Sequence, residues 1–188
     1  ADEVVEKLKN NTPYVVRLKM PNKEVVFNDL IRGEVKNDLS LMGDIIIAKS
    51  VYEPLYNFAV VVDDYLMKIS HVIRGEDHIT NTAKQLAIYD AFGWEVPMFA
   101  HLPLILNKDK TKLSKRNNLV SILDYKREGY LPEAIINFIT LLGWHPKEDK
   151  EIITLDETIS EFSLDRVQKG GAVFDIDRLN FLNKHYIA

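Results

Sequence analysis

The chain has 188 residues, of which 46% are apolar, and its formal net charge is −4. This apolar fraction can bury a core, which excludes a disordered tail, and the negative charge restricts any RNA contact to local patches. The lack of cysteine excludes disulfides and thiolate metal sites, and the five histidines have no zinc-helix spacing, so we expect no protein-bound metal. We recognise no transmembrane run or signal peptide and therefore expect a soluble, cytoplasmic protein.

The first part of the chain, residues 1–52, has the pattern of a small β-rich unit. Helical spacing predicts a short helix over residues 1–11. Alternating, β-branched segments then predict strands over residues 14–20, 24–29, 31–35 and 44–48. The turn at 21–23 suggests that the first two strands pair as a hairpin. We find no acid/base pair or nucleophile in this unit.

A strand–helix–strand pattern follows. Residues 58–62 are apolar on both faces, as in a central strand or a buried helical turn, and periodicity leaves both possibilities open. A short strand over 72–73 ends in the charged cluster 74–78, which is costly to crowd unless its members hold a ligand or each other. A helix over 82–92, capped within Thr80-Asn81-Thr82 and stopped by Gly93, precedes a strand over 98–106.

The second strand of this unit runs into a cationic loop. Residues 108–116 contain four lysines and one arginine against a single aspartate. Such charges repel one another unless an anion neutralises them, and lysine suits a moving phosphate because its charge sits on a flexible stem. If the helix is a right-handed crossover, the cluster 74–78 and this loop lie at the same sheet edge, where α/β folds bind phosphorylated ligands. A solvated surface loop is the alternative interpretation.

The remaining segment, residues 120–188, has a helical pattern. Its apolar stripes, which include Trp144, indicate a packed core rather than a ligand site. Its expected helices begin at capping or first-turn residues, namely Ser121, Pro132, Thr154 (with Glu157 at capping-box spacing), Ser163 and Asp175.

Seven segments together resemble the bacterial-type glutamyl-tRNA synthetases, which are class I enzymes. In chain order they are YNFAVVVDD (56–64), VIRGEDH (72–78), AHLPLIL (100–106), KLSKR (112–116), GYLPEA (129–134), LLGW (141–144) and VFD (173–175). A lysine-rich loop alone is weak evidence. The ordered set spans nearly the whole chain and is much more specific.

The resemblance implies an α/β fold of three parts. Residues 1–52 would belong to the insertion that contacts the acceptor end of tRNA, and residues 53–116 would form the second half of the Rossmann-like catalytic domain. Residues 117–188 would form the helical stem-contact domain, on the inner side of the tRNA. The implied enzyme is a monomer that uses ATP, with Mg²⁺, to activate L-glutamate as glutamyl-adenylate and transfers it to tRNA(Glu).

The resemblance also implies a set of site residues. Segment 112–116 corresponds to the KMSKS signature of the family, with Lys112 and Lys115 as catalytic residues and Lys115 holding the ATP phosphates as pyrophosphate leaves. It assigns ATP binding to Asp77, His78, Ile105, Lys112, Leu113, Ser114, Lys115 and Arg116. It assigns glutamate binding to Tyr56, Asn57, Phe58, Ala59, Val60 and Arg74. Arginine suits the last position because its guanidinium can hold a carboxylate with two hydrogen bonds.

One signature of class I synthetases does not occur in this sequence. The family carries a His-x-Gly-His motif well upstream of the position of Tyr14, and its anticodon-binding domain would follow Ile187. We therefore expect the chain to be an internal segment that does not aminoacylate alone. The choice between charging only tRNA(Glu) and also tRNA(Gln) depends on anticodon recognition outside these residues.

Three alternative functions fit the same residues. The nearest is a glutamyl-queuosine tRNA synthetase, a shorter relative with a similar loop, and a glutaminyl-tRNA synthetase is more distant. A non-catalytic RNA-binding module that kept the fold is the alternative from another class. In such a module Arg74 and Lys115 would have no ligand.

Overall fold

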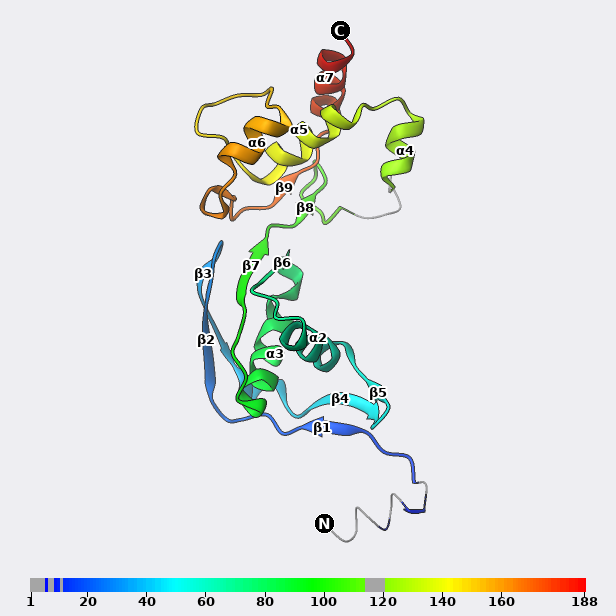
Figure 1. Ribbon diagram of the computed structural model, residues 1–188, viewed down its shortest axis with the longest axis vertical. Coiled ribbons are helices and arrows are strands. Elements are labelled where there is room, and N and C mark those ends of the chain that lie inside the picture. The colour runs from blue at the N-terminus through cyan, green and yellow to red at the C-terminus, as the bar shows by residue number, and fades with distance from the viewer. Residues whose placement is uncertain (1–5, 7–8, 11, 114–120) are drawn as a thin grey trace. The chain divides into compact units, whose positions relative to one another are not determined.

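The computed structural model describes residues 6, 9–10, 12–113 and 121–188 (Figure 1). The chain forms two compact units and passes between them several times. The first unit takes its described residues from Ala1–Asn28, Glu34–Val72 and His78–Met98, and the second is built from Asp29–Gly33, Ile73–Asp77 and Phe99–Ala188. Within the described residues, no helix has the length and apolar character needed to cross a bilayer.

The first strands pair differently from the predicted hairpin. Strand β1 (Val16–Leu18) pairs antiparallel with β4 (Ile45–Ser50), which pairs antiparallel with β5 (Glu53–Pro54). Strand β2 (Glu24–Asp29) instead neighbours β3 (Gly33–Asp38), in a sheet of order β3-β2-β7-β6. The turn after β2 explains the error, because the Asp29 carboxylate accepts hydrogen bonds from the Ile31 and Arg32 amides and closes a tight local turn. The helix predicted over 1–11 lies mostly outside the described residues.

The ambiguous apolar run 58–62 is helical. It lies inside α2 (Tyr56–Leu66), which packs against α3 (Ile79–Phe92) in the first unit. Val61, Ile88 and Tyr89 form the buried core between the two helices. Helix α3 ends, as predicted, at Gly93, whose φ of 66° is left-handed. It begins at Ile79, earlier than the predicted cap, and the Thr82 hydroxyl donates to the His78 carbonyl inside the helix instead of capping its start.

The expected strand 98–106 is divided in two. Strand β7 (Met98–Leu102) lies between β2 and β6 (His71–Gly75) in the sheet order, and Asp29 of β2 pairs in parallel with Phe99. Pro103, which has no amide hydrogen, follows β7 and ends its ladder. Strand β8 (Ile105–Leu106) then pairs in parallel with β9 (Ala172–Val173) in the second unit. Short 3₁₀ turns complete these regions, namely η1 (Leu39–Met42), η2 (Glu76–His78) and η3 (Leu164–Arg166).

The helical part of the second unit follows its predicted caps closely. It contains α4 (Ile122–Arg127), α5 (Pro132–Gly143), α6 (Leu155–Glu161) and α7 (Ile176–Ile187) (Figure 1). Both Ser121 and Thr154 form capping boxes, and the Asp175 side chain accepts a hydrogen bond from the Asp177 amide at the start of α7. Ser163 makes no side-chain capping bond, and only the 3₁₀ turn η3 follows it.

The contact between α5 and α7 forms a core that can be tested directly. Phe138 of α5 is buried with Leu179 and Leu182 of α7 and lies edge-on to Phe174, with ring centroids 5.0 Å apart. We expect Phe138→Ala to lower the free energy of unfolding by about 3–5 kcal/mol, the usual cost of emptying a buried aromatic site. Hydrogen exchange of the α5 and α7 amides in the complete protein measures this loss.

An exposed phenylalanine provides the matched control. Phe181 lies on α7 but is 53% exposed, so Phe181→Ala is expected to change the free energy of unfolding by no more than about 0.5 kcal/mol. Equal protection losses in the two variants would show that this core does not hold α5 and α7 together.

Candidate functional site

Near its end, strand β6 carries an arginine, Arg74, that is held from two sides within the second unit. The Arg74 Nε atom donates a hydrogen bond of 3.3 Å to Nε2 of His101 in β7. Its guanidinium carbon also lies 5.6 Å from the centroid of the Phe99 ring, in a cation–π arrangement. The structure therefore fixes both the position and the plane of the guanidinium at the end of a strand.

Behind this arginine lies a buried acid–imidazole pair. Oδ2 of Asp29 is 2.6 Å from Nδ1 of His101, and both side chains are 0% exposed. The other oxygen, Oδ1, accepts hydrogen bonds from the backbone amides of Ile31, Arg32 and His101. Burial by itself raises the pKa of Asp29, but these amide bonds and the His101 bond outweigh it and bring the pKa below its ordinary 3.8. Asp29 is thus a carboxylate at neutral pH.

The lowered pKa of Asp29 predicts a component of acid sensitivity. The pKa is lower in the folded chain than in the unfolded chain, so Asp29 stabilises the fold above its ordinary value, and this stabilisation disappears as the pH falls through the folded pKa. We expect the free energy of unfolding of the wild type to fall more steeply below about pH 4 than that of Asp29→Asn. Urea unfolding of both proteins between pH 2 and 7 tests this, and parallel curves would contradict it.

The acidic cluster after β6 is partly explained by internal contacts. Glu76 forms an ion pair of 2.6 Å with Arg32 and accepts a hydrogen bond from the Leu104 amide. Arg32 also donates to the carbonyls of His101 and Lys169. The sequence left open that members of this cluster hold a ligand or each other, but the partners of Glu76 in this structure, Arg32 and Leu104, lie outside residues 74–78.

The cationic loop meets the same cluster through a different acid. Nζ of Lys112 lies 2.8 Å from Oδ2 of Asp77, and the Leu113 amide donates to the Ile105 carbonyl. The predicted proximity of 74–78 and the loop is therefore confirmed for the residues that are described. The other three predicted loop residues, Ser114, Lys115 and Arg116, lie outside the described residues.

Lys108, at the other end of the loop, is engaged elsewhere. Its Nζ lies 2.8 Å from Asp175 and 2.6 Å from Asp177, at the N-terminus of α7. The hydrogen bonds to these two carboxylates raise the pKa of Lys108, which stays fully charged. The sequence interpretation counted this lysine among the charges that await an anion, and the structure shows that two acids of this chain already neutralise it.

The predicted glutamate-site residues of α2 belong to the first unit. Tyr56 opens the helix and is half exposed, and its ring centroid lies 6.0 Å from that of His78. Oδ1 of Asn57 accepts a hydrogen bond from Nε2 of Gln85, and Nδ2 of Asn81 lies 3.2 Å from His78 Nδ1. Phe58 packs against the α2–α3 core, while Ala59 and Val60 are half-buried. Within this unit, Tyr56, Asn57 and His78 occupy one neighbourhood at the start of α2 and α3.

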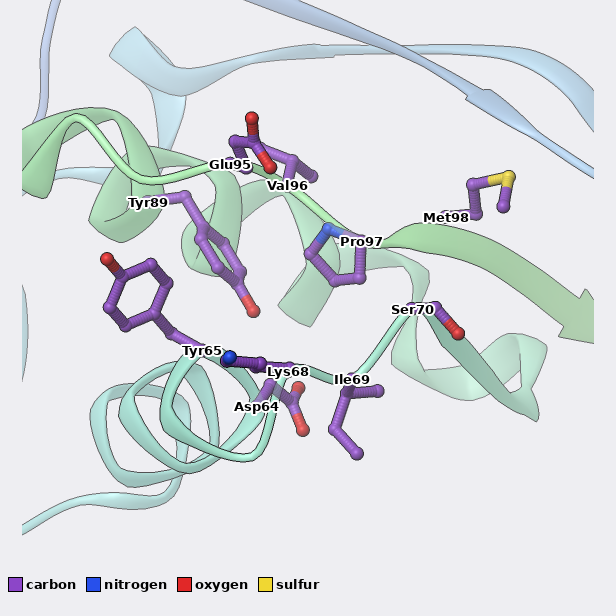
Figure 2. A pocket seen from close by; sticks show the side chains of 10 residues that line it. All are labelled: Asp64, Tyr65, Lys68, Ile69, Ser70, Tyr89, Glu95, Val96, Pro97 and Met98. Atoms are coloured by element: carbon purple, nitrogen blue, oxygen red, sulfur yellow. The ribbon is translucent and has the colours of Figure 1, made fainter.

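A cavity of about 490 Å³ in the first unit lies away from these residues. Figure 2 shows its lining, which comes from the end of α2 and the segment after it, from α3, and from residues 95–98 at the start of β7. Tyr65, on its wall, stacks on Trp94 with ring centroids 4.0 Å apart. None of the predicted site residues belongs to its lining, so this cavity is not the predicted substrate site.

Sequence reasoning assigned no role to Asp29 and His101. His101 is a polar residue in an otherwise apolar strand, Phe99-Ala100-His101-Leu102, and a buried polar residue in such a strand needs a partner. That pattern was the available indication that His101 has a buried polar partner. The partner lies 72 positions away in the sequence, so only the fold reveals the pair.

The comparisons with known proteins place this arrangement in a family. The family model for tRNA synthetases class I (E and Q), catalytic domain, matches residues 1–181. The chain belongs to this family. The resemblance to class I synthetases and the predicted fold class are therefore confirmed.

Curated relatives and solved structures of the family agree. Glutamate–tRNA ligase of Clostridioides difficile is 49% identical over 187 residues, which are 99% of this chain and 38% of that protein. The enzyme of Desulforamulus reducens is 53% identical over 174 residues, 92% of this chain and 36% of that protein. The crystal structure of a glutamate tRNA ligase from Elizabethkingia meningosepticum, in complex with its amino acid, matches with a TM-score of 0.91 and 40% identity, covering 99% of this chain and 41% of that one. The chain thus spans about two fifths of the length of these relatives.

Proposed function

We propose that the complete protein containing this chain is an ATP-dependent ligase that activates L-glutamate as glutamyl-adenylate and transfers it to tRNA(Glu). The observation that supports this best is the pairing of two features in the second unit. Arg74 is held near the end of β6, and Asp77, three residues further on, holds Lys112 of the cationic loop. An arginine fork suits a carboxylate, and a lysine loop suits phosphates.

In the proposed reaction, the lysines of the cationic loop stabilise the phosphates during adenylate formation. The glutamate α-carboxylate attacks the α-phosphate of ATP and pyrophosphate leaves, so negative charge grows on the leaving phosphates. Lys112 and Lys115 stabilise that charge, and Lys115 follows the departing group on its flexible stem. In the state described here Lys112 is paired with Asp77, so phosphates that recruit it compete with this carboxylate.

The remaining predicted residues complete the proposed substrate contacts. Tyr56 and Asn57 lie against the amino acid with the backbone of residues 58–60, His78 and Asp77 lie by the adenylate, and Ile105 lies under the adenine. Ile105 is an exposed apolar side chain on β8, which suits contact with a flat base. The ATP-binding role proposed for Leu113, Ser114 and Arg116 rests on the family resemblance of segment 112–116.

In this proposal, Mg²⁺ binds together with ATP, through the phosphates of the nucleotide. Mg²⁺ takes oxygen ligands and is usually bound through substrate phosphates and one or two carboxylates. The described part of the chain has no group of three or more His, Cys, Asp or Glu side chains placed to hold a metal ion. The ion would screen the triphosphate charge, and we assign no step of the reaction to it.

The proposed division of tRNA contacts follows the family resemblance. Residues 1–52 contact the acceptor end, 53–116 form the catalytic half-domain, and 117–188 contact the inner side of the tRNA. The complete enzyme is proposed to act as a monomer in the cytoplasm.

Binding of a non-hydrolysable adenylate tests the proposal. We expect the complete protein to bind a glutamyl-sulfamoyl adenosine at least about 10²-fold more tightly than the glutaminyl analogue in calorimetry, because an uncharged amide cannot satisfy the half-buried guanidinium of Arg74 as a carboxylate does. Equal affinities, or tighter binding of the glutaminyl analogue, would exclude glutamate as the substrate. Absence of binding to both would favour the RNA-binding module.

A further inference from the structure

We propose that His101, oriented by Asp29, positions Arg74 for the substrate carboxylate. The inference rests on the proposed function, because it assumes that Arg74 recognises glutamate. His101 does not contact substrate in this scheme; it acts through Arg74. Three side chains from three strands form the chain of contacts, with Asp29 at the end of β2, His101 in β7 and Arg74 in β6.

The partners of His101 decide which of its nitrogens carries the proton. Arg74 Nε is always a donor, so the Nε2 atom that it meets at 3.3 Å must be unprotonated. Asp29 is an acceptor, so the Nδ1 atom that it meets at 2.6 Å must carry the hydrogen. His101 is therefore assigned as the neutral Nδ1–H tautomer, and Asp29 selects it.

The surroundings make this orientation rigid. Asp29 is locked by three backbone amides, and the His101 carbonyl accepts a hydrogen bond from Arg32 Nε. The His101 ring lies nearly parallel to that of Phe99, with an interplanar angle of 12°, and Phe99 also faces the guanidinium of Arg74. Neither the imidazole nor the carboxylate is exposed, so water cannot replace one of them as a partner.

The contact between His101 and Arg74 determines how a substrate carboxylate can approach the guanidinium. Nε is one of the three nitrogens of the guanidinium, and His101 engages it. A substrate carboxylate then meets the two terminal nitrogens end-on, in a direction set by the strand rather than by the flexible arginine side chain. A misplacement of about 1 Å at such a group can lower the rate about 10²-fold, so loss of the contact that fixes Nε should have a measurable effect on the reaction.

Two substitutions of His101 separate its two contacts. Asparagine places an amide near the position of Nδ1, so His101→Asn keeps a donor for Asp29 but cannot reach Arg74. Glutamine reaches further, so His101→Gln keeps an acceptor for Arg74 but loses the donor for Asp29. In steady-state aminoacylation by the complete protein, we expect His101→Asn to raise the KM for glutamate about 10- to 100-fold, with the KM values for ATP and tRNA changed less than about 3-fold.

The glutamine variant is expected to show the opposite pattern. It should keep the KM for glutamate within about 5-fold of the wild type but lower Tm more than His101→Asn does, because Asp29 then lacks its buried side-chain donor. His71→Asn is the matched control, since His71 is exposed and contacts Ser70. It should leave all three KM values and Tm unchanged.

Asp29→Asn tests the tautomer itself. The carboxamide oxygen can keep the three backbone amides, but its NH₂ group donates to Nδ1 and so forces the proton onto Nε2, against the Nε–H of Arg74. We expect ¹⁵N chemical shifts of labelled histidine to show an unprotonated Nε2 in the wild type and a protonated Nε2 in Asp29→Asn. The KM for glutamate should rise in the same way as in His101→Asn.

The outcomes distinguish this inference from the proposed function. A wild type that charges no glutamate would refute the proposed function and, with it, the role of His101. A wild type that charges glutamate, together with a His101→Asn variant of unchanged KM for glutamate, would refute the positioning role alone. Parallel rises in all three KM values, or identical behaviour of the asparagine and glutamine variants, would also refute it, because they would indicate general damage to the fold.

Discussion

Replacing Lys115 by alanine in the complete protein is expected to lower the rate of tRNA aminoacylation by about 10²–10³-fold, the scale for losing one donor to a charged transition state. The reason is the proposed position of Lys115 in the cationic loop 108–116, where its charge meets the pyrophosphate as it leaves. The loss should appear in kcat rather than in the KM for glutamate, because the lysine acts on phosphate. Single-turnover charging with saturating ATP measures it.

A lysine of the same loop provides the control. Lys110 has a φ of 65°, a left-handed conformation that asparagine tolerates better than alanine, so Lys110→Asn removes one charge without straining the turn. We expect it to stay within about 3-fold of the wild-type rate. If Lys115→Ala matched this control, the loop would be the solvated surface run that its composition also allows.

The second large effect is expected at Arg74. Arg74→Lys keeps the positive charge but loses the planar fork, the Nε bond to His101 and the stacked contact with Phe99. We expect kcat/KM for glutamate to fall at least about 10²-fold, because lysine cannot replace a bidentate fork and a misplacement of about 1 Å at such a group has a cost of that size. Initial rates over a range of glutamate concentrations, at fixed ATP and tRNA, measure the change.

Arg127→Lys is the matched control for this substitution. Arg127 is exposed on α4 and pairs with Asp124 one helical turn away, so the same change of side chain should be neutral. A glutamate kcat/KM within about 3-fold of the wild type in Arg74→Lys would mean that Arg74 does not recognise the substrate.

Local sequence determined which features of the fold were predictable. The caps at Ser121 and Thr154 depend on residues at most three positions apart, and both caps were predicted correctly, with the capping box itself predicted only at Thr154. The pairing of β1 was predicted wrongly, because its partner β4 begins 27 residues beyond the end of β1, whereas the predicted partner lay one short turn away. Two strands with similar alternation do not reveal in their own residues which edge they share.

The candidate site shows the same division. Its segments were found from motifs and from the topology that brings strand ends together, and the contact of Lys112 with Asp77 confirms that reasoning. Lys108 was predicted to carry an unneutralised charge, because nothing near it in the sequence indicates the two acids at the N-terminus of α7. The Asp29–His101 pair was missed for the same reason, since a long-range buried contact leaves only an isolated polar residue in an apolar strand.

The most direct test of the central claim is charging of an unmodified tRNA(Glu) transcript by the complete protein with labelled glutamate. We predict ATP-dependent formation of glutamyl-tRNA, with glutamine charged at least about 10²-fold more slowly because it lacks the side-chain carboxylate that Arg74 is proposed to hold. An unmodified transcript carries no queuosine, so charging it also excludes attachment to that base. Failure to charge the transcript with glutamate, under conditions where the protein binds it, would contradict the account and favour a module that binds RNA without catalysis.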